Sequence, residues 1–223
     1  MSPRRTQDRA RRTREALVSS ARRLFAERGY AGVSAEEIVA AAGLTRGALH
    51  HHFGDKKELF RAVLEQVETE LVARVGEAIG TAADSWQAAT AGLAAFLDIC
   101  EEPEVLQIAL RDAPAVLGWA AWREIEAAHG LGLIKAGLQQ AMDEHVLTAQ
   151  PVDVLAHLVL SAVNEAALLI AHAPDRGAAR AEAERAIVAL LAGLRVTPLS
   201  RGGGDGAGRA PTGGSRSSSG RTG

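Results

Sequence analysis

Residues 34–57 constrain the fold of this chain more than any other stretch, because they predict two short helices joined by a tight turn. Ser34 and Glu37 are three residues apart, the spacing of a capping box at the start of a helix. Gly43 stands where a left-handed residue ends that helix at little cost, and Thr45 can cap the next one. The stretch therefore predicts a helix-turn-helix.

The second of these helices has an inward and an outward side. Leu49 and Phe53 lie four residues apart and should face the interior. The residues left to face outward are Arg46, Gly47, His50 and His51. A short second helix presented at its N-terminal end enters the major groove of DNA in helix-turn-helix proteins. There an arginine such as Arg46 can donate two hydrogen bonds to guanine O6 and N7.

The composition predicts an all-α fold. Apolar residues make up 47% of the 223 residues and aromatic residues only 4%, and Ala and Leu, both strong helix formers, are abundant. No segment alternates with period two, as a strand would. We expect an N-terminal three-helix helix-turn-helix DNA-binding domain and a C-terminal helical ligand-binding and dimerisation domain.

Charge is divided along the chain. Residues 1–60 hold 12 basic and 7 acidic side chains, a net +5, whereas residues 61–200 hold 9 and 19, a net −10. A basic end on an acidic body is expected of a protein that touches phosphates with one end only. Chance segregation of charge is the alternative reading.

Three segments are expected. Residues 1–54 form a mobile basic arm (1–9) and the DNA-binding domain. Residues 55–199 form the helical body, which starts with a linking helix over 55–79, and the Gly/Ser/Arg-rich residues 200–223 form a disordered tail. The expected helices of the body span about 55–79, 84–101, 103–112, 115–128, 133–145, 152–173 and 176–194, after a first helix over about 8–28.

The sequence also indicates where the protein works. The single Cys100 fits a reducing cytosol, and no secretory segment is seen, so we expect a cytoplasmic protein. Residues 154–173 are the most apolar stretch, but four polar residues interrupt them: His157, Asn164, Glu165 and His172. We therefore expect a buried helix there and no membrane association.

The chain resembles the TetR family of bacterial transcriptional regulators. The matching motifs are Gly29-Tyr30-x-Gly32-Val33-Ser34, Ala41 to Leu49 and His52 to Lys56, in the order of the family. The resemblance implies homodimers whose first three helices bind DNA. It implies that Ser34 and Lys56 contact phosphates, that Thr45, Arg46, Gly47 and Ala48 meet base edges, and that His50 and His51 contact backbone or bases. The family often has Tyr where this chain has His50.

No metal, cofactor or catalytic centre is expected. Consecutive helical residues point about 100° apart, so His50, His51 and His52 do not converge on one ion. No phosphate-binding glycine motif, Gly-x-Ser-x-Gly or His-Glu-x-x-His pattern occurs. Cys100 has no basic partner nearby in sequence and is interpreted as a small buried apolar residue.

A pocket for a largely apolar small-molecule effector is predicted in the body, because large aromatic residues and a few polar residues interrupt its Ala/Leu-rich helices. The candidate walls are Phe96, Trp119 and Trp122, with Trp86. The candidate anchors are Arg111, His157, Asn164 and Glu165, with Asp112. The same residues could instead be plain core, satisfied polar pairs or interface contacts.

Residues 152–194 are the expected homodimer surface, since two copies of the last two helices would form a four-helix interface. A twofold dimer would face a palindromic operator in double-stranded DNA. The hypothesis is thus a ligand-responsive repressor. The alternatives are a helical enzyme or ligand carrier whose N-terminal helices bind a protein, and a DNA-binding regulator without an effector.

Overall fold

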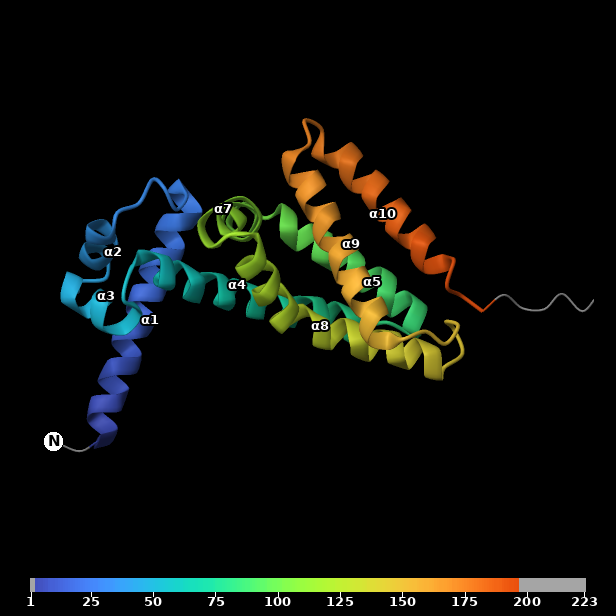
Figure 1. Ribbon diagram of the computed structural model, residues 1–223, viewed down its shortest axis with the longest axis horizontal. Helices are drawn as coiled ribbons and strands as arrows, with labels where there is room; N and C mark the ends of the chain where they lie inside the picture. Colours follow the sequence, from blue (N-terminus) through green and yellow to red (C-terminus); the bar gives the residue numbers. More distant parts are fainter. Residues whose placement is uncertain (1–2, 197–223) are drawn as a thin grey trace, which may run out of the picture.

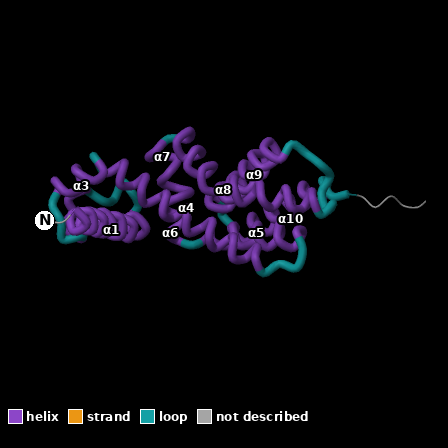
Figure 2. The backbone as a smooth tube through the Cα atoms, turned by 90° about the horizontal axis from the view of Figure 1, so that it is seen from below, coloured by secondary structure: helices purple, strands orange, loops and turns teal. Residues whose placement is uncertain are grey.

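A computed structural model describes residues 3–196 of the chain, with side chains from Gln7 onward. All named elements of this part are helical, and its only β feature is an isolated bridge between Leu147 and Arg195. The elements are α1 (Pro3–Arg28), α2 (Ala35–Ala41), α3 (Arg46–Phe53), α4 (Lys56–Gly80), α5 (Ser85–Glu101), α6 (Pro103–Val105), the π-helix η1 (Leu106–Asp112), α7 (Ala113–Leu117), α8 (Trp119–Asp143), α9 (Val152–His172) and α10 (Arg176–Ala192). The predicted all-α fold is confirmed (Figure 2). The tail over 200–223 lies outside the described residues.

The molecule is elongated, with α1, α2 and α3 at one end and α9 and α10 at the other (Figure 1). α4 leaves the first end and runs into the body, where it packs against α5 and α8. The twenty-five residues of α4 rise 1.5 Å each, so the helix spans roughly 37 Å. This one helix therefore connects the two ends, as predicted for the linking helix.

Local signals start and end the N-terminal helices as predicted. Ser34 forms the complete capping box with Glu37, and the side chains of Thr45 and Asp55 cap α3 and α4. Gly43 has φ 66°, a left-handed conformation that costs a glycine little. One expectation is wrong here: residues 3–9 continue α1 as helix and are no separate arm.

The helices of the body differ from the expected spans 103–112, 115–128 and 133–145. Pro114 does not break the helical path, because it lies in the first turn of α7, where the N–H that proline lacks would have no partner within the helix. The break comes at Gly118, with φ 89°, and α8 then runs without interruption past Gly130 and Gly132. A Cβ on Gly130 would lie 3.2 Å from Leu160 Cδ1, so this glycine lets α9 approach α8 closely.

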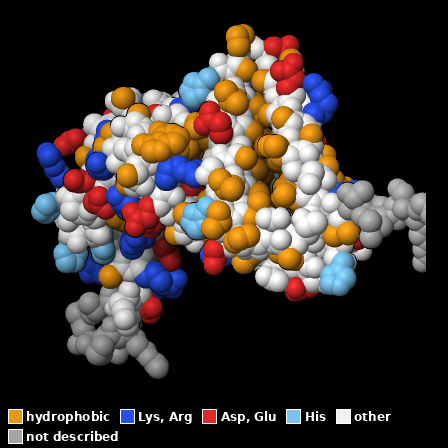
Figure 3. All heavy atoms as spheres, turned by 45° about the vertical axis from the view of Figure 1, so that its right-hand side comes forward, with side chains coloured by type: hydrophobic (Ala, Val, Ile, Leu, Met, Phe, Trp, Pro, Cys, Tyr) orange, Lys and Arg blue, Asp and Glu red, His pale blue; other side chains and the backbone are white. Residues whose placement is uncertain are grey.

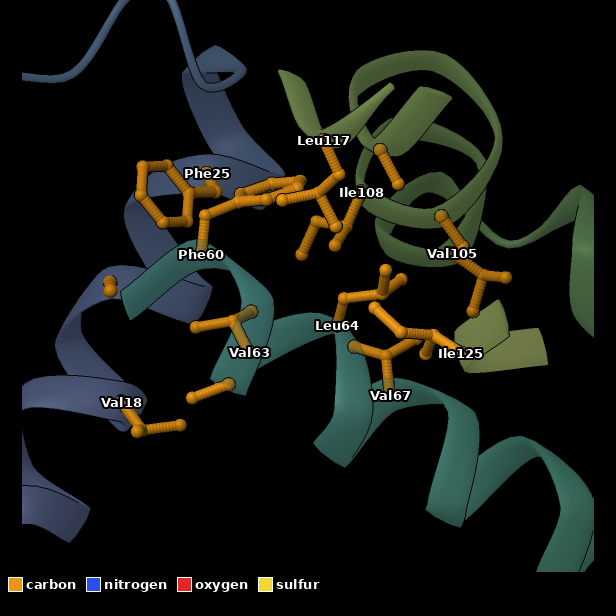
Figure 4. Close-up of a cluster of buried hydrophobic side chains, with 14 of the residues drawn as sticks. Val18, Phe25, Phe60, Val63, Leu64, Val67, Val105, Ile108, Leu117 and Ile125 are labelled. Atoms are coloured by element: carbon orange, nitrogen blue, oxygen red, sulfur yellow. The ribbon is translucent and has the colours of Figure 1, made fainter. Parts of the chain in front are cut away.

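The DNA-binding end and the body share one hydrophobic core. Phe25 of α1 packs edge-to-face on Phe60 of α4, with ring centroids 5.3 Å apart, and the same cluster reaches Ile108 of η1 and Ile125 of α8 (Figure 4). The boundary expected at residue 54 is thus a change of helix within a continuous core. Motion of the body can therefore be transmitted to the first helices by packing.

Candidate nucleic-acid interface and internal cavity

Helix α3 presents a polar outer side at one end of the molecule. Leu49 is buried and Phe53 is half-buried beneath the guanidinium of Arg14, which lies 4.8 Å from its ring centroid. The exposed residues are Arg46, Gly47, His50 and His51. The predicted division of this helix into an inward and an outward side is confirmed.

Arg46 projects from the first turn of α3 and is 78% exposed. Its Nη1 lies 2.8 Å from Oε1 of Glu36, itself exposed on α2. An exposed ion pair of this kind contributes at most about 1 kcal/mol. The arginine is therefore held loosely and can exchange Glu36 for another acceptor.

The first turn of α3 carries little side-chain bulk, so another molecule can come close to its backbone. Thr45 Oγ1 accepts a hydrogen bond from Ala48 N at 3.3 Å, which fixes the first turn. A Cβ on Gly47 would have only Thr45 Oγ1 within 4 Å, at 3.8 Å. The fold therefore leaves room for a side chain at position 47, and packing does not explain why a glycine stands there.

Ser34 and the histidines already have partners inside the chain. Ser34 Oγ donates to Glu37 Oε2 at 2.8 Å and accepts from Glu37 N at 3.2 Å. His50 Nδ1 lies 2.6 Å from the carbonyl oxygen of Gly54, and the rings of His51 and His52 meet edge-to-face. Ser34, His50 and His51 remain exposed, so all three can still meet a ligand from outside.

Lys56 has a role that the sequence did not indicate. Its Nζ donates to the carbonyl oxygens of Tyr30 and Val33 at 2.9 and 2.7 Å and lies 3.8 Å from the centroid of the Tyr30 ring. Burial lowers the pKa of Lys56, while the charges of Asp112 and Glu37 oppose this. Lys56 thus holds the loop between α1 and α2, and its contact with a phosphate stays a prediction. The neighbouring Lys57 is the more exposed cation.

The body encloses a cavity of about 190 Å³. Its walls come from α4, α5, η1, α8, α9 and α10 and are mostly apolar. Phe96, Trp86 and Asn164, three of the residues singled out in the sequence, line it. It also reaches Val105 in α6.

The other predicted pocket residues lie elsewhere. Trp122 is fully buried in the main core, whereas Trp119 is 57% exposed and packs against Trp122 with the two rings tilted by 58°. Arg111 and Glu165 are exposed, and His157 is exposed with Nδ1 against the carbonyl oxygen of Asp153 in its own helix. None of these five residues lines the cavity, nor does Asp112, because helical periodicity places a residue on a face but does not show which neighbouring helix covers that face. Trp122 belongs to the plain core, one of the alternatives that the sequence left open.

Two acids in the cavity wall were missed. Glu68 of α4 and Glu126 of α8 are each 6% exposed. Burial raises the pKa of Glu68 to about 7. Burial, and then the charge of Glu68, raise that of Glu126 to about 8, against the effects of Arg123 and Asn164. The signal was present in the sequence: Glu68 continues the helical row of Leu64, Leu71 and Val75.

Two structural routes join the cavity to the DNA-binding end. α4 contributes cavity wall with Leu71 and Val75 and, a few turns earlier, holds the first helices through Phe60. η1 contributes cavity wall with Ala109 and Leu110 and ends at Asp112.

Polar contacts join η1 and its neighbour α6 to the DNA-binding end. Asp112 Oδ2 accepts a hydrogen bond from Tyr30 N at 2.7 Å. Arg22 of α1 donates to both carboxylate oxygens of Glu104 and both of Glu70, each at 2.7 Å. Since Arg22 pairs with α4 and α6 together, a shift of either element changes the geometry at α1.

The outer face of α9 and α10 includes a set of exposed apolar side chains. Its large members are Val154, Leu158, Leu169 and Leu190, between 59% and 67% exposed, and hydrophobic side chains gather over these helices in Figure 3. By length and composition α9 could also cross a membrane, but that test is met by core helices too, and its other face packs on α5, α8 and α10. Large apolar side chains exposed together on neighbouring helices are typical of an interaction site.

Comparisons of sequence agree with this architecture. Residues 17–63 match the bacterial regulatory proteins of the tetR family, and residues 86–194 match the tetracyclin repressor-like C-terminal domain. The transposon Tn10 TetC protein of Escherichia coli is 31% identical over 156 residues, which cover 69% of this chain and 77% of that protein. The repressor AcnR of Corynebacterium efficiens is 39% identical over 72 residues, 32% of this chain and 38% of AcnR.

Solved structures show the same fold. A TetR-family transcriptional regulator from Pectobacterium atrosepticum superposes with a TM-score of 0.77 at 36% identity, over 89% of this chain and all of that one. RolR in complex with resorcinol superposes with a TM-score of 0.69 at 18% identity, over 83% of this chain and 90% of that one, a likeness of fold alone. The chain belongs to the TetR family of bacterial transcriptional regulators.

Proposed function

We propose that this regulator is a repressor that binds a palindromic operator as a homodimer and leaves it when a small molecule fills the internal cavity. The observation that carries the proposal is that α4 both walls the cavity and anchors the helices that present α3. The protein would act in the cytoplasm, where the DNA is, and would bind its effector without chemical turnover.

Arg46 is the side chain best placed to read a base. It is exposed, stands in the first turn of α3 and, within residues 7–196, pairs only with the exposed Glu36. Exchange of that carboxylate for guanine O6 and N7 would discriminate against a wrong base by roughly 1–3 kcal/mol. Gly47 and Thr45 allow the backbone to come close to the groove, and Lys57 would contact a phosphate.

The apolar face of α9 and α10 would join two copies. Leu158 and Leu169 lie on one side of α9, since their separation of eleven residues is close to three helical turns. A second copy placed there would cover the exposed leucines and form a four-helix interface. The two α3 helices would then meet half-sites one DNA turn apart, roughly 34–36 Å.

Release of the protein from the operator would follow if the effector binds two states of the protein with different affinity. An effector can shift the protein only if it favours the state that does not bind the operator. Filling the cavity would move α4 and η1 relative to one another. The ties from Arg22 and Asp112 would carry that shift to α1 and so change the spacing of the two α3 helices.

Selection of bound fragments from a random DNA pool tests the proposal. We expect a palindrome whose binding weakens steeply with salt, and a dimer in sedimentation experiments. Leu158→Glu should give a monomer that binds the operator at least a hundredfold more weakly. Ala73→Glu, an equally drastic change at an exposed position of α4, is the control and should leave the dimer intact. Turnover of a small molecule without DNA binding would favour the enzyme or carrier instead.

A further inference from the structure

Two buried carboxyl groups line the cavity, and none of its described lining residues is a lysine, arginine or histidine. Glu68 reaches it from α4 and Glu126 from α8, and both carboxyl groups are nine-tenths or more withdrawn from solvent. The remaining walls are mostly aliphatic and aromatic, apart from a few polar groups such as Asn164 and Cys100. A buried carboxylate is costly unless it is paired and hydrogen-bonded.

Glu126 has partners. The Asn164 side-chain amide donates to its Oε2, and Arg123 Nη1 lies 3.4 Å from the same atom. Arg123 is shared, since its other terminal nitrogen donates to Ser161 Oγ at 2.8 Å. The Arg123 guanidinium therefore pairs with the carboxyl group of Glu126 and not with that of Glu68.

Glu68 has no partner among the described residues: none of their hydrogen bonds or ion pairs includes its carboxyl group. The charged or titratable groups whose interaction with it is evident are Glu126 and the buried Cys100, and neither supplies positive charge. Burial raises the pKa of Glu68 to about 7, so the carboxyl group is part protonated near neutral pH. A plain core would place an apolar residue at this position in the row of Leu64, Leu71 and Val75.

We infer that the effector is an organic cation, an apolar molecule with one protonated or quaternary amine that binds beside Glu68 and Glu126. The inference rests on the proposed function, in which this cavity is the effector site. A single positive charge would balance the second carboxylate, and the aliphatic walls would cover the apolar body of the molecule. An anionic effector is disfavoured by repulsion from both acids.

The size of the cavity limits the effector. One water molecule needs roughly 10–15 Å³ measured in this way, so about 190 Å³ has room for roughly a dozen non-hydrogen atoms. An amine with one aromatic ring and a short chain has this size. The test therefore uses 4-phenylbutylamine, benzyltrimethylammonium and the neutral 4-phenylbutanol, together with 5-phenylpentanoate as the anion.

Titration calorimetry on the full-length protein at pH 8.5 measures the four affinities. We expect both cations to bind at least tenfold more tightly than 4-phenylbutanol and the anion not to bind detectably. Glu68→Gln, which keeps the shape of the side chain, should remove the preference for cations. Glu77→Gln, at an exposed position of the same helix, is the matched control and should keep it. Equal affinities for 4-phenylbutylamine and 4-phenylbutanol in the wild-type protein would overturn the inference.

A second readout needs no variant. Benzyltrimethylammonium carries its charge at every pH, so any proton released when it binds comes from the protein. Binding near pH 7 should release protons, measured as a difference between buffers of different ionisation enthalpy, and should tighten as the pH rises from 6 to 8.5. Binding without proton release, or no binding of either amine, would also overturn the inference. Operator binding by the same preparation shows separately whether the proposed DNA-binding function stands.

Discussion

The backbone N–H of Tyr30 donates a 2.7 Å hydrogen bond to the carboxylate of Asp112, across 82 positions of sequence. Tyr30 lies in the loop between α1 and α2, and Asp112 is the last residue of η1. Lys56 holds the same loop from the other side through the carbonyl oxygens of Tyr30 and Val33. The loop is thus the point where the cavity wall and the DNA-binding helices are tied together.

Asp112→Ala removes this tie. A half-buried N–H would lose a charged acceptor, so we expect the free energy of unfolding to fall by roughly 1–3 kcal/mol. Amide exchange of residues 30–33 should become faster, measured by hydrogen–deuterium exchange. Asp143→Ala, which alters an exposed carboxylate at the end of α8, is the control and should change neither quantity.

Substitutions of Arg46 and of its partner Glu36 should change the affinity for the operator in opposite directions. Arg46→Ala should weaken binding to the selected operator by roughly tenfold to a hundredfold and binding to random DNA much less, because it removes a base contact. Glu36→Gln removes the competing carboxylate and a negative charge near the DNA, so it should tighten operator binding. Fluorescence anisotropy with both DNAs measures these effects. Equal losses on both DNAs would mean that Arg46 contacts phosphate only.

Gly47 and Gly43 provide a matched pair of substitutions. At Gly47 the fold has room for a Cβ, so Gly47→Ala should leave stability unchanged or raise it by roughly 0.5–1 kcal/mol, yet weaken operator binding by crowding the groove. At Gly43, φ is 66°, so Gly43→Ala should destabilise the protein by roughly 1–2 kcal/mol. Thermal unfolding and anisotropy separate the two effects. Full operator affinity in Gly47→Ala would argue against close backbone approach.

Substitutions of Lys56 and Lys57 should likewise differ in their effects on stability and on operator binding. Lys56→Ala removes two hydrogen bonds inside the protein and should lower the free energy of unfolding by roughly 1–2 kcal/mol. Lys57→Ala should leave stability unchanged and reduce the dependence of operator binding on salt by about one phosphate contact. Binding isotherms at several salt concentrations measure this dependence. A reduced slope in Lys56→Ala without loss of stability would restore the phosphate contact expected from the sequence.

Stability should fall as the pH rises from 5 to 8.5. Burial raises the pKa of Glu68 to about 7 and that of Glu126 to about 8, above the usual value of 4.5. In this range the folded protein holds more protons than the unfolded chain, so unfolding becomes easier as the pH rises. Glu68→Gln should flatten the curve of melting temperature against pH, and Glu77→Gln should not. A wild-type curve that rises across this range would contradict the assigned shifts.

Features that depend on near neighbours in sequence were predicted well. The capping residues Ser34 and Thr45 act on amides three residues ahead, and Gly43 needs only its own backbone conformation. The inward position of Leu49 follows from helical spacing. These features suffice to predict the helix-turn-helix and to indicate which side of α3 faces outward.

Features that depend on distant neighbours were not predicted. A break was expected between residues 128 and 133, but Gly130 lies where Leu160 of α9 approaches α8, and packing between helices keeps α8 continuous. Trp119 and His157 were expected in a pocket and lie exposed, while Glu68 was overlooked and lines the cavity. Periodicity alone does not show which face of a helix its neighbours leave open.

The sequence by itself determined the all-helical fold and the turn that presents Arg46, because helix capping and spacing are local properties, and its motifs showed the resemblance to the TetR family. Only the tertiary structure decided that Lys56 holds a loop, that Asp112 ties η1 to Tyr30 and that two acids meet in one apolar cavity. Each of these depends on side chains brought together from separate helices, and the free energy of such contacts comes from packing and burial that no short stretch of sequence contains.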